Sequence, residues 1–130
     1  MKFGYTIVYV ASVADALAFY ESAFGFATRF LHESGGYGEL DTGATVLAFA
    51  SHELGAAHFP AGYRQVDDGG APLGIELAFV TDDVPAAFDR AVAAGAAPLT
   101  APAAMPWGQT VAWVRGKDGA LIELCTPVST

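Results

Sequence analysis

The chain of 130 residues has few of the residues from which several kinds of site are built. It contains one cysteine and three histidines, which excludes an intrachain disulfide and a zinc-finger-type cluster. We expect that cysteine, Cys125, to be a small buried apolar residue. Lysine and arginine together number 6 against 14 acidic residues, and the net charge is −8. Because no basic stripe is present to neutralise phosphates, binding to nucleic acid or to an anionic membrane is disfavoured.

Long apolar runs are also missing. Hydrophobic residues make up 53% of the chain, yet no run approaches the ~20 residues of a membrane helix. Residues 3–11 are apolar and follow Lys2, but they lead directly into a helical pattern that carries Asp15 and Glu21. We therefore interpret them as a first strand rather than as an export signal. The length suits one domain with its own core, and we expect a soluble cytoplasmic protein.

The expected secondary structure follows an order that occurs twice. In the first half, a strand at residues 3–10 precedes a helix that Ser12 caps and Gly25 ends. Apolar residues recur at helical spacing on one face of that helix, at Val13, Leu17, Tyr20 and Phe24. Three strands follow at residues 27–32, 37–41 and 44–50.

The second half repeats this order. A strand at residues 73–80 precedes a helix that Asp82 or Asp83 caps and Gly95 ends, and strands follow at 97–100, 109–115 and 120–126. The chain thus contains two βαβββ modules, at 1–51 and 73–130, and a linker at 52–72 rich in Gly, Ala and Pro. Each module buries one sheet face under its helix. We predict a single α+β domain of two curved mixed sheets that enclose a cleft, within one chain or across a dimer.

Two short motifs carry a resemblance to a known family. The first runs from Phe19-Tyr20 to Gly25-Phe26, and the second from Asp118-Gly119 to Ile122-Glu123-Leu124. In this order the chain resembles, over nearly its whole length, the vicinal oxygen chelate superfamily of glyoxalase I, bleomycin-resistance proteins, fosfomycin-resistance enzymes and extradiol dioxygenases. The resemblance implies the glyoxalase/bleomycin-resistance fold and a homodimer in which sheets of both chains complete each cleft.

The resemblance also implies four positions at which related enzymes bind a divalent metal. They fall on Tyr5, Ala48, Glu76 and Glu123. Ala48 offers no donor and no imidazole is present, so only a hard cation on Glu123 and Glu76 suits this set, and we expect no cofactor. Strand alternation turns both carboxylates away from the helix. There they are candidates for a general acid and base, or for hydrated carboxylates that line a wet cleft.

Four further residues are candidates for ligand binding. His52 directly follows the last strand of the first module, where an imidazole can carry a proton or replace a ligand. Phe59 and Tyr63 lie in the linker, and long loops beside a cleft often line it. Trp107 is either a stacking wall for a planar ligand or a structural cap on the sheet edge. We expect Trp113 to pack against a helix.

Two main functions follow from these residues. The first is a metal-free binding protein of the bleomycin-resistance type, which holds an aromatic or cationic compound in an acidic cleft. The second is a metal-dependent lyase, isomerase or dioxygenase of the glyoxalase type with an altered ligand set centred on Glu123, Glu76 and His52. A regulatory binding subunit is a third reading. Glu76 and Glu123 decide between binding and catalysis, and the sequence leaves that decision open.

Overall fold

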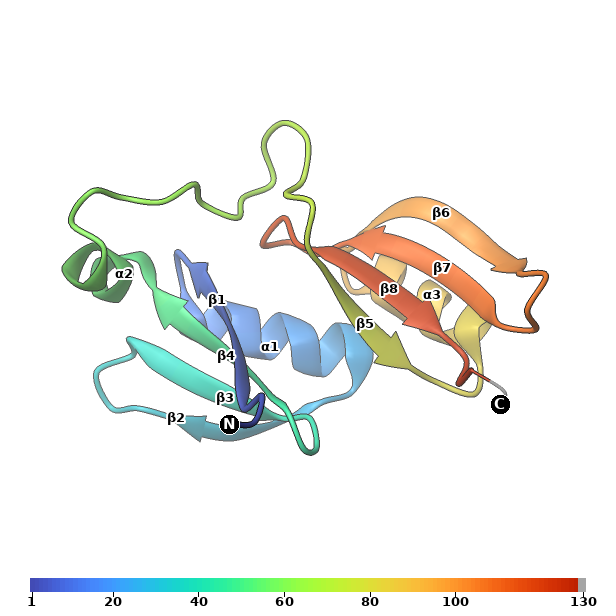
Figure 1. Cartoon of the computed structure of the whole chain (residues 1–130), viewed down its shortest axis with the longest axis horizontal. Helices are drawn as coiled ribbons and strands as arrows, with labels where there is room; N and C mark the ends of the chain where they lie inside the picture. Colours follow the sequence, from blue (N-terminus) through green and yellow to red (C-terminus); the bar gives the residue numbers. More distant parts are fainter. Residues whose placement is uncertain (129–130) are drawn as a thin grey trace. The chain divides into compact units, whose positions relative to one another are not determined.

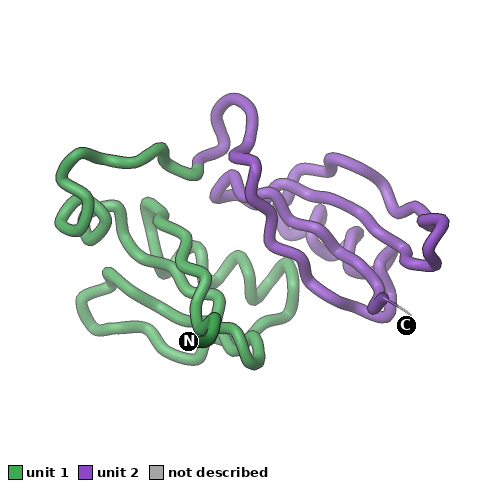
Figure 2. The backbone as a smooth tube through the Cα atoms, in the orientation of Figure 1, with its two compact units in different colours: residues 1–66 green, residues 67–130 purple. Residues whose placement is uncertain are grey.

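Two units of the same architecture make up the computed structural model, which describes residues 1–128. The backbone divides into a first unit, Met1–Val66, and a second unit that begins at Asp67 (Figure 2). Each unit contains a four-stranded sheet with a helix packed on one face (Figure 1). The element order confirms the predicted α+β fold of two βαβββ modules.

The first unit contains a mixed sheet of strand order β1-β4-β3-β2. Its elements are β1 (Tyr5–Val10), α1 (Val13–Phe24), β2 (Ala27–Leu31), β3 (Tyr37–Asp41), β4 (Val46–Ser51) and α2 (His52–His58). β1 and β4 run parallel, whereas β3 pairs antiparallel with both β4 and β2. The helix α1 packs on β2, β3 and β4.

The second unit repeats this arrangement with strand order β5-β8-β7-β6. Its elements are β5 (Glu76–Val80), α3 (Val84–Ala93), β6 (Ala97–Ala104), β7 (Thr110–Arg115) and β8 (Leu121–Cys125). β5 and β8 run parallel and the other pairs are antiparallel, as in the first sheet. None of the helices within residues 1–128 is long and apolar enough to cross a membrane.

Local signals set the ends of the helices. The Ser12 hydroxyl accepts a hydrogen bond from the Asp15 amide at 3.2 Å and so caps α1. Gly25 ends α1 at φ 79°, in the left-handed region that favours glycine. Of the two aspartates proposed for α3, Asp83 is the cap, and its carboxylate accepts from the Ala86 amide at 3.1 Å.

The core of each unit lies between its helix and its sheet. In the first unit, Tyr20 and Phe49 are fully buried, and their ring centroids are 4.9 Å apart. Gly38 in β3 lets α1 approach closely, because a Cβ there would lie 2.8 Å from the Leu17 side chain. In the second unit, Ile122 and Val84 are fully buried. The burial of these residues confirms the predicted helix-facing sides of α1, α3 and the last strands.

Several predicted boundaries change for reasons of strand pairing. β5 begins at Glu76 rather than at residue 73, because its neighbour β8 begins opposite Glu76, at Leu121. Ile75 precedes the strand and is 75% exposed. β6 continues to Ala104 rather than ending at residue 100, and two register shifts accommodate its prolines at the sheet edge.

The predicted linker is not entirely irregular. Its first residues form α2, which begins where the Ser51 hydroxyl accepts a hydrogen bond from the Leu54 amide at 3.1 Å. A short helix directly after β4 therefore belongs to the first unit only. From residue 67 the linker belongs to the second unit.

Candidate functional site

The face of each sheet that is not covered by its helix is the open face. The first open face belongs to the sheet of the first unit, and the second open face belongs to the sheet of the second unit. Strand register decides which residues lie on it. Tyr5 pairs with Val46 in the first sheet, and Glu76 pairs with Leu121 in the second. The remaining candidates, Ala48 and Glu123, lie two residues further along the last strand of each module. All four positions therefore belong to open faces, at equivalent places in the two sheets.

The second open face brings Glu76 and Glu123 together with a tryptophan. Trp113 in β7 lies opposite Glu123 in β8, and its indole Nε1 donates a hydrogen bond to Glu76 Oε2 at 2.8 Å. The prediction that Trp113 packs against a helix is therefore wrong. The helix side of β7 is occupied by its neighbours Ala112 and Val114, both fully buried.

Cys125 also belongs to the second open face, two residues beyond Glu123. It is 5% exposed, and its Sγ lies 3.8 Å from the carbonyl oxygen of Phe79. Burial raises the pKa of the Cys125 thiol to about 11, with further contributions from a hydrogen bond with Glu123 and from the charges of Glu123 and Glu76. The predicted buried cysteine is confirmed, and at neutral pH it is a thiol rather than a nucleophilic thiolate.

The two carboxylates of the second open face lack a cationic partner. No lysine or arginine within residues 1–128 forms an ion pair with Glu76 or Glu123. Arg115, the cation on the neighbouring strand β7, is directed elsewhere. Its guanidinium donates to the carbonyl oxygens of Gly70 at 2.7 Å, Asp67 at 2.8 Å and Gly119 at 3.1 Å. The negative charge of the carboxylates is thus left for water or a ligand to balance.

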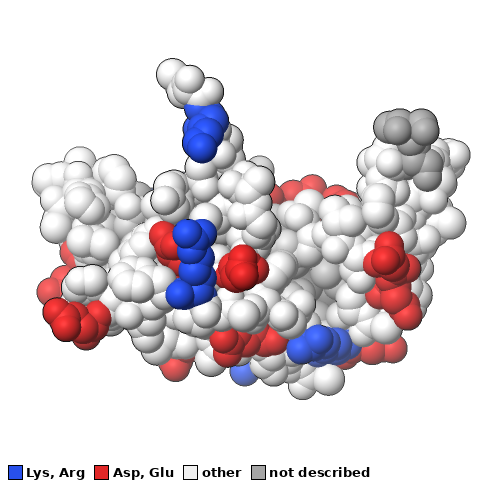
Figure 3. Space-filling model, turned by 90° about the horizontal axis from the view of Figure 1, so that it is seen from below, with Lys and Arg blue, Asp and Glu red and all other residues white. Residues whose placement is uncertain are grey.

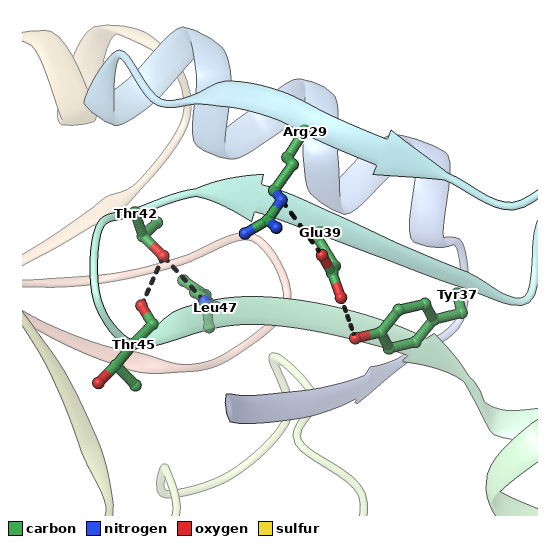
Figure 4. A network of polar contacts seen from close by, with 6 residues as sticks. All are labelled: Arg29, Tyr37, Glu39, Thr42, Thr45 and Leu47. Carbon is green, nitrogen blue, oxygen red and sulfur yellow. Dashed lines mark hydrogen bonds and ion pairs between the residues drawn. The ribbon is translucent and has the colours of Figure 1, made fainter. Parts of the chain in front are cut away.

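The first open face carries a polar network that the sequence analysis missed. Glu39 in β3 lies opposite Ala48, and its Oε2 accepts a hydrogen bond from the Tyr37 hydroxyl at 2.7 Å (Figure 4). Its other oxygen, Oε1, lies 3.8 Å from Arg29 Nε. Strand alternation in residues 37–41 was a usable signal for Tyr37 and Glu39, whereas nothing local marks Arg29.

The protonation state of this network follows from its contacts. Burial, followed by the hydrogen bond to Glu39 and the charge of Glu39, raises the pKa of the Tyr37 phenol well above its ordinary range. Tyr37 therefore remains a hydrogen-bond donor.

The turn after β3 is fixed by the Thr42 hydroxyl, which donates to the Thr45 carbonyl and accepts from the Leu47 amide, both at 2.9 Å (Figure 4).

The linker candidates form an aromatic cluster with β1. The ring of Tyr9 lies 5.1 Å from Tyr63 and 5.9 Å from Phe59, measured between centroids. His52 contributes through Nδ1, which lies 2.8 Å from the Tyr63 hydroxyl. Gly55 makes this packing possible, since a Cβ at that position would overlap the Tyr63 ring. His52, Phe59 and Tyr63 are thus brought together, and Tyr9 is the member that the sequence analysis missed.

Trp107 stands apart from these groups. It lies in the loop between β6 and β7, is 59% exposed, and donates to Gln109 Oε1 at 2.8 Å. No hydrogen bond joins it to Glu76 or Glu123. A separate hollow of about 360 Å³ lies between the β2–β3 turn and α2, and none of the candidate residues lines it.

The residues at the four metal positions do not suit a transition metal. Ala48 has no donor atom, and Glu76 Oε2 already accepts the Trp113 N–H. Within residues 1–128, no three His, Cys, Asp or Glu side chains are grouped so that they can hold a metal ion. The set offers carboxylate and phenol oxygens without imidazole or thiolate, a poor match for a borderline metal.

Charge on the surface agrees with the acidic composition. On the face that Figure 3 displays, acidic side chains are spread over the surface and the few basic ones do not form a patch. This distribution offers no continuous track for a phosphate backbone.

Comparisons with known proteins place this geometry in a family. The family model described as glyoxalase/bleomycin resistance protein/dioxygenase superfamily matches residues 2–124. A crystal structure of a family enzyme from Burkholderia phytofirmans PsJN is 22% identical, with a TM-score of 0.83 over 99% of this chain and 100% of that one. A glyoxalase-related enzyme from Fulvimarina pelagi is 20% identical, with a TM-score of 0.79 over 98% and 88% of the respective chains.

A protein of unknown function from Agrobacterium tumefaciens str. C58 is 22% identical, with a TM-score of 0.77 over 98% of this chain and 94% of that one. At these identities the structural likeness establishes the fold alone. No curated protein matches the chain. The family match covers almost the whole sequence, and the chain therefore belongs to the glyoxalase/bleomycin resistance protein/dioxygenase superfamily.

Proposed function

We propose that the chain is a small-molecule-binding protein whose ligand is an aromatic or cationic compound, and that no transition metal takes part in binding. One observation carries this proposal. Glu76 and Glu123 share an open face with Trp113 and have no cationic partner within residues 1–128. Glu76 is exposed and Glu123 is half-buried, so a ligand cation can reach both carboxylates from solvent and supply both charge and hydrogen-bond donors.

Each residue of the second open face has a distinct role in this proposal. The Trp113 N–H occupies Glu76 Oε2 and so holds that carboxylate in place. Glu76 Oε1 remains to accept hydrogen bonds from a ligand, and Glu123 can accept further ones beside its hydrogen bond with the Cys125 thiol. A planar amidinium or guanidinium group matches such acceptors with parallel N–H donors. The face of the Trp113 ring offers a cation–π contact to the same group.

The aromatic candidates of the first unit have a supporting role. Tyr9, Phe59 and Tyr63 pack into one wall, with Phe59 46% exposed. Tyr5, on the open face of β1, is 56% exposed. We propose that these rings contact an aromatic ligand at the first unit itself, because large exposed aromatic surface is characteristic of binding sites.

The test compares an aryl cation with its uncharged isostere. Benzamidine and benzamide are titrated into ¹⁵N-labelled protein, and the two indole N–H signals are assigned with Trp107→Phe. We expect benzamidine to shift the Trp113 signal and benzamide to leave it unchanged. Glu123→Gln is expected to weaken benzamidine binding by about tenfold or more. The matched control Glu33→Gln removes the same charge from an exposed turn and should leave binding unchanged.

A metal-dependent lyase, isomerase or dioxygenase is the alternative, and the unpaired carboxylates are the feature in its favour. Metal content is measured on the purified protein, followed by melting scans with Mn²⁺, Ni²⁺, Zn²⁺ and Fe²⁺. A ligand of the native state raises the melting temperature by mass action. A large saturable rise that disappears in Glu123→Gln would overturn the metal-free proposal.

We also propose a homodimer that resides in the cytoplasm. Ile75 and Val80, at the two ends of β5, are 75% and 66% exposed, and exposed apolar side chains favour association. A single free cysteine suits a reducing compartment. Light scattering on the purified protein checks the oligomeric state, and a monomer would contradict this part of the proposal.

A further inference from the structure

We propose that Arg29 on the first open face recognises an oxyanion, a carboxylate or phosphate group carried by an aromatic ligand. The inference deepens the proposed function, on which it rests for the ligand being a small aromatic compound. It assigns to the first unit a binding residue and a ligand charge opposite to those of the second. The observations that carry it are the backbone geometry at Arg29, its contacts with Glu39 and its aromatic surroundings.

A β-bulge brings Arg29 to the open face. Thr28 pairs with Leu40 and Phe30 pairs with Glu39, so one extra residue of β2 stands between two consecutive residues of β3. Leu40 is fully buried beneath the helix, whereas Glu39 belongs to the open face. Because the bulge interrupts the alternation, Arg29 reaches the same face as Phe30. Bulges of this kind redirect a side chain and are frequent beside functional sites.

Glu39, which Tyr37 holds in place, lies within ion-pair distance of the Arg29 guanidinium. Glu39 Oε1 lies 3.8 Å from Arg29 Nε, and Glu39 Oε2 accepts the Tyr37 hydroxyl at 2.7 Å (Figure 4). The Glu39 side chain is only 14% exposed, so this carboxylate is held on both sides and cannot swing freely into water. The Arg29 side chain is 57% exposed. A half-buried acid thus lies beside the inner nitrogen of an outward-facing cation.

The outer nitrogens of Arg29 remain for a ligand. The ion pair in Figure 4 ends on Nε, and no residue within 1–128 accepts a hydrogen bond from Nη1 or Nη2. Those two nitrogens carry the paired donors that match a carboxylate or phosphate in a bidentate manner. Arg115 offers a contrast within the same protein, since backbone carbonyl oxygens occupy its Nε, Nη1 and Nη2.

Aromatic side chains lie on the same open face as Arg29. Phe30, the next residue, pairs with Glu39 and is 46% exposed. Its ring lies 6.5 Å from that of Tyr37, measured between centroids. An aryl group attached to the oxyanion therefore finds exposed aromatic surface on the same face as the guanidinium. Glu39 offsets part of the positive charge, so we expect a simple aryl anion to bind with millimolar rather than micromolar affinity.

The test uses small aryl probes of defined charge. Benzoate, phenyl phosphate, inorganic phosphate and uncharged benzamide are each titrated into ¹⁵N-labelled protein, and the Nε–H signal of Arg29 is followed, together with the backbone amide signal of Phe30, which is also present in the Arg29 variants. We expect both aryl anions to shift that signal and benzamide to leave it in place. Stronger binding of benzoate assigns a carboxylate, and stronger binding of phenyl phosphate or inorganic phosphate assigns a phosphate.

Three variants separate recognition by Arg29 from general charge effects. Arg29→Gln should weaken the aryl anions by about tenfold or more, because it removes the charge and the paired donors. Arg29→Lys should retain part of the affinity, since it keeps the charge without the planar fork. Arg64→Gln removes an equal charge from the same unit and should leave binding unchanged. Circular dichroism confirms that each variant is folded.

The outcomes also separate this inference from the proposed function. Equal shifts with benzoate and benzamide, no shift with any anion, or undiminished benzoate binding in Arg29→Gln overturns the role of Arg29. If benzamidine still shifts Trp113 in that case, the proposed function stands without it. If anions bind at Arg29 while benzamidine fails at Trp113, the inference stands and the cationic ligand is wrong.

Discussion

The two modules present the same backbone positions on their open faces and fill them with different chemistry. Glu39 opposite Ala48 in the first sheet corresponds to Trp113 opposite Glu123 in the second. In the first sheet the carboxylate is on β3 and lies 3.8 Å from Arg29. In the second sheet the carboxylates are on β5 and β8, and an indole N–H is the donor beside them. The first open face thus carries a cation beside its carboxylate, whereas within residues 1–128 the second open face carries none beside Glu76 and Glu123.

This difference shows how little the shared frame determines. Strand order, pairing direction and the register of the parallel strand pairs agree between the modules. The charge that each open face presents depends on which strand holds the acid and on where the nearest arginine is directed. Fold membership therefore fixes the positions that a ligand can meet, while the side chains at those positions fix its charge.

The cores differ as well. Counted from the helix caps Ser12 and Asp83, Tyr20 in α1 takes the place of Ala91 in α3, and both are fully buried. Six residues of α1 are buried against two of α3. We therefore expect the first module to contribute more packing energy per helix than the second.

The largest expected effect comes from the helix of the first module. Tyr20→Ala removes a ring that contacts Phe19, Phe24 and Phe49, and should lower the free energy of unfolding by about 3–5 kcal/mol. Phe88→Ala in α3, at a half-buried position, should cost less. Urea unfolding measures both. Equal losses of unfolding free energy in the two variants would show that α1 and α3 contribute equally to stability, and the expected difference between the modules would be wrong.

The second effect concerns α2, which only the first module has. Gly55→Ala places a methyl group against the Tyr63 ring, so the aromatic cluster must shift. We expect a loss of about 2 kcal/mol and a changed near-ultraviolet dichroism signal from the tyrosines. Gly4→Ala meets open space and is the control, with a change within about 0.5 kcal/mol. An unchanged tyrosine signal in Gly55→Ala would contradict the close packing of Tyr63.

The third effect concerns the arginine of the second module. Arg115→Gln removes the donors to the carbonyl oxygens of Asp67, Gly70 and Gly119 and should cost about 1.5 kcal/mol. We expect a protease that cleaves beside aspartate to cut faster at Asp67 and Asp68 in the variant. Unchanged cleavage would mean that the segment is held without Arg115, leaving that cation available to the carboxylates.

The smallest effect is the pH dependence that Cys125 of the second open face contributes to stability. In the folded protein the pKa of Cys125 is raised from an ordinary 9.0 to about 11, so the folded state holds its proton where the unfolded state has lost it. The stability that Cys125 contributes through its raised pKa is fully present below pH 9.0 and is lost as the pH rises toward about 11. The free energy of unfolding is measured from pH 9 to 11 in the unchanged protein and in Cys125→Ala, and only the unchanged protein should show this decline.

A companion variant tests the neighbour of this thiol. Glu123→Gln removes a negative charge beside Cys125, so alkylation of the thiol should begin at lower pH than in the unchanged protein. Because burial is the leading cause of the raised pKa of Cys125, the pKa read from the alkylation profile of Glu123→Gln should stay above the ordinary 9.0. If the alkylation profile does not move, Glu123 does not influence Cys125 and the two are not neighbours in solution.

The parts of the structure that depend on neighbouring residues in sequence were predictable. Ser12 and Gly25 mark α1 because caps act over three or four residues. Glu123 was assigned to the open face because Ile122 and Leu124 on either side are apolar. Trp113 was misplaced because Ala112 and Val114 are apolar too, so alternation cannot distinguish the faces there. Its face is decided by pairing with β8.

Arg29 was missed for a related reason. Its direction depends on the register between β2 and β3, a relation between strands that no local pattern encodes. Likewise, Tyr9 meets Phe59 and Tyr63 because α2 turns the chain back toward β1. α2 itself starts from a serine cap within a segment whose glycine and alanine content resembles a linker.

The bulge in β2 makes the charge of the first open face depend on chain length. Loss of one residue between Thr28 and Phe30 would restore regular alternation, so that a single side chain, rather than two, meets the face opposite Glu39. A relative shortened by one residue there would keep every motif and the whole fold, yet leave Glu39 without its arginine. Whether a relative lacks one residue at this point of β2 should therefore predict the charge of its ligand more reliably than its overall sequence identity does.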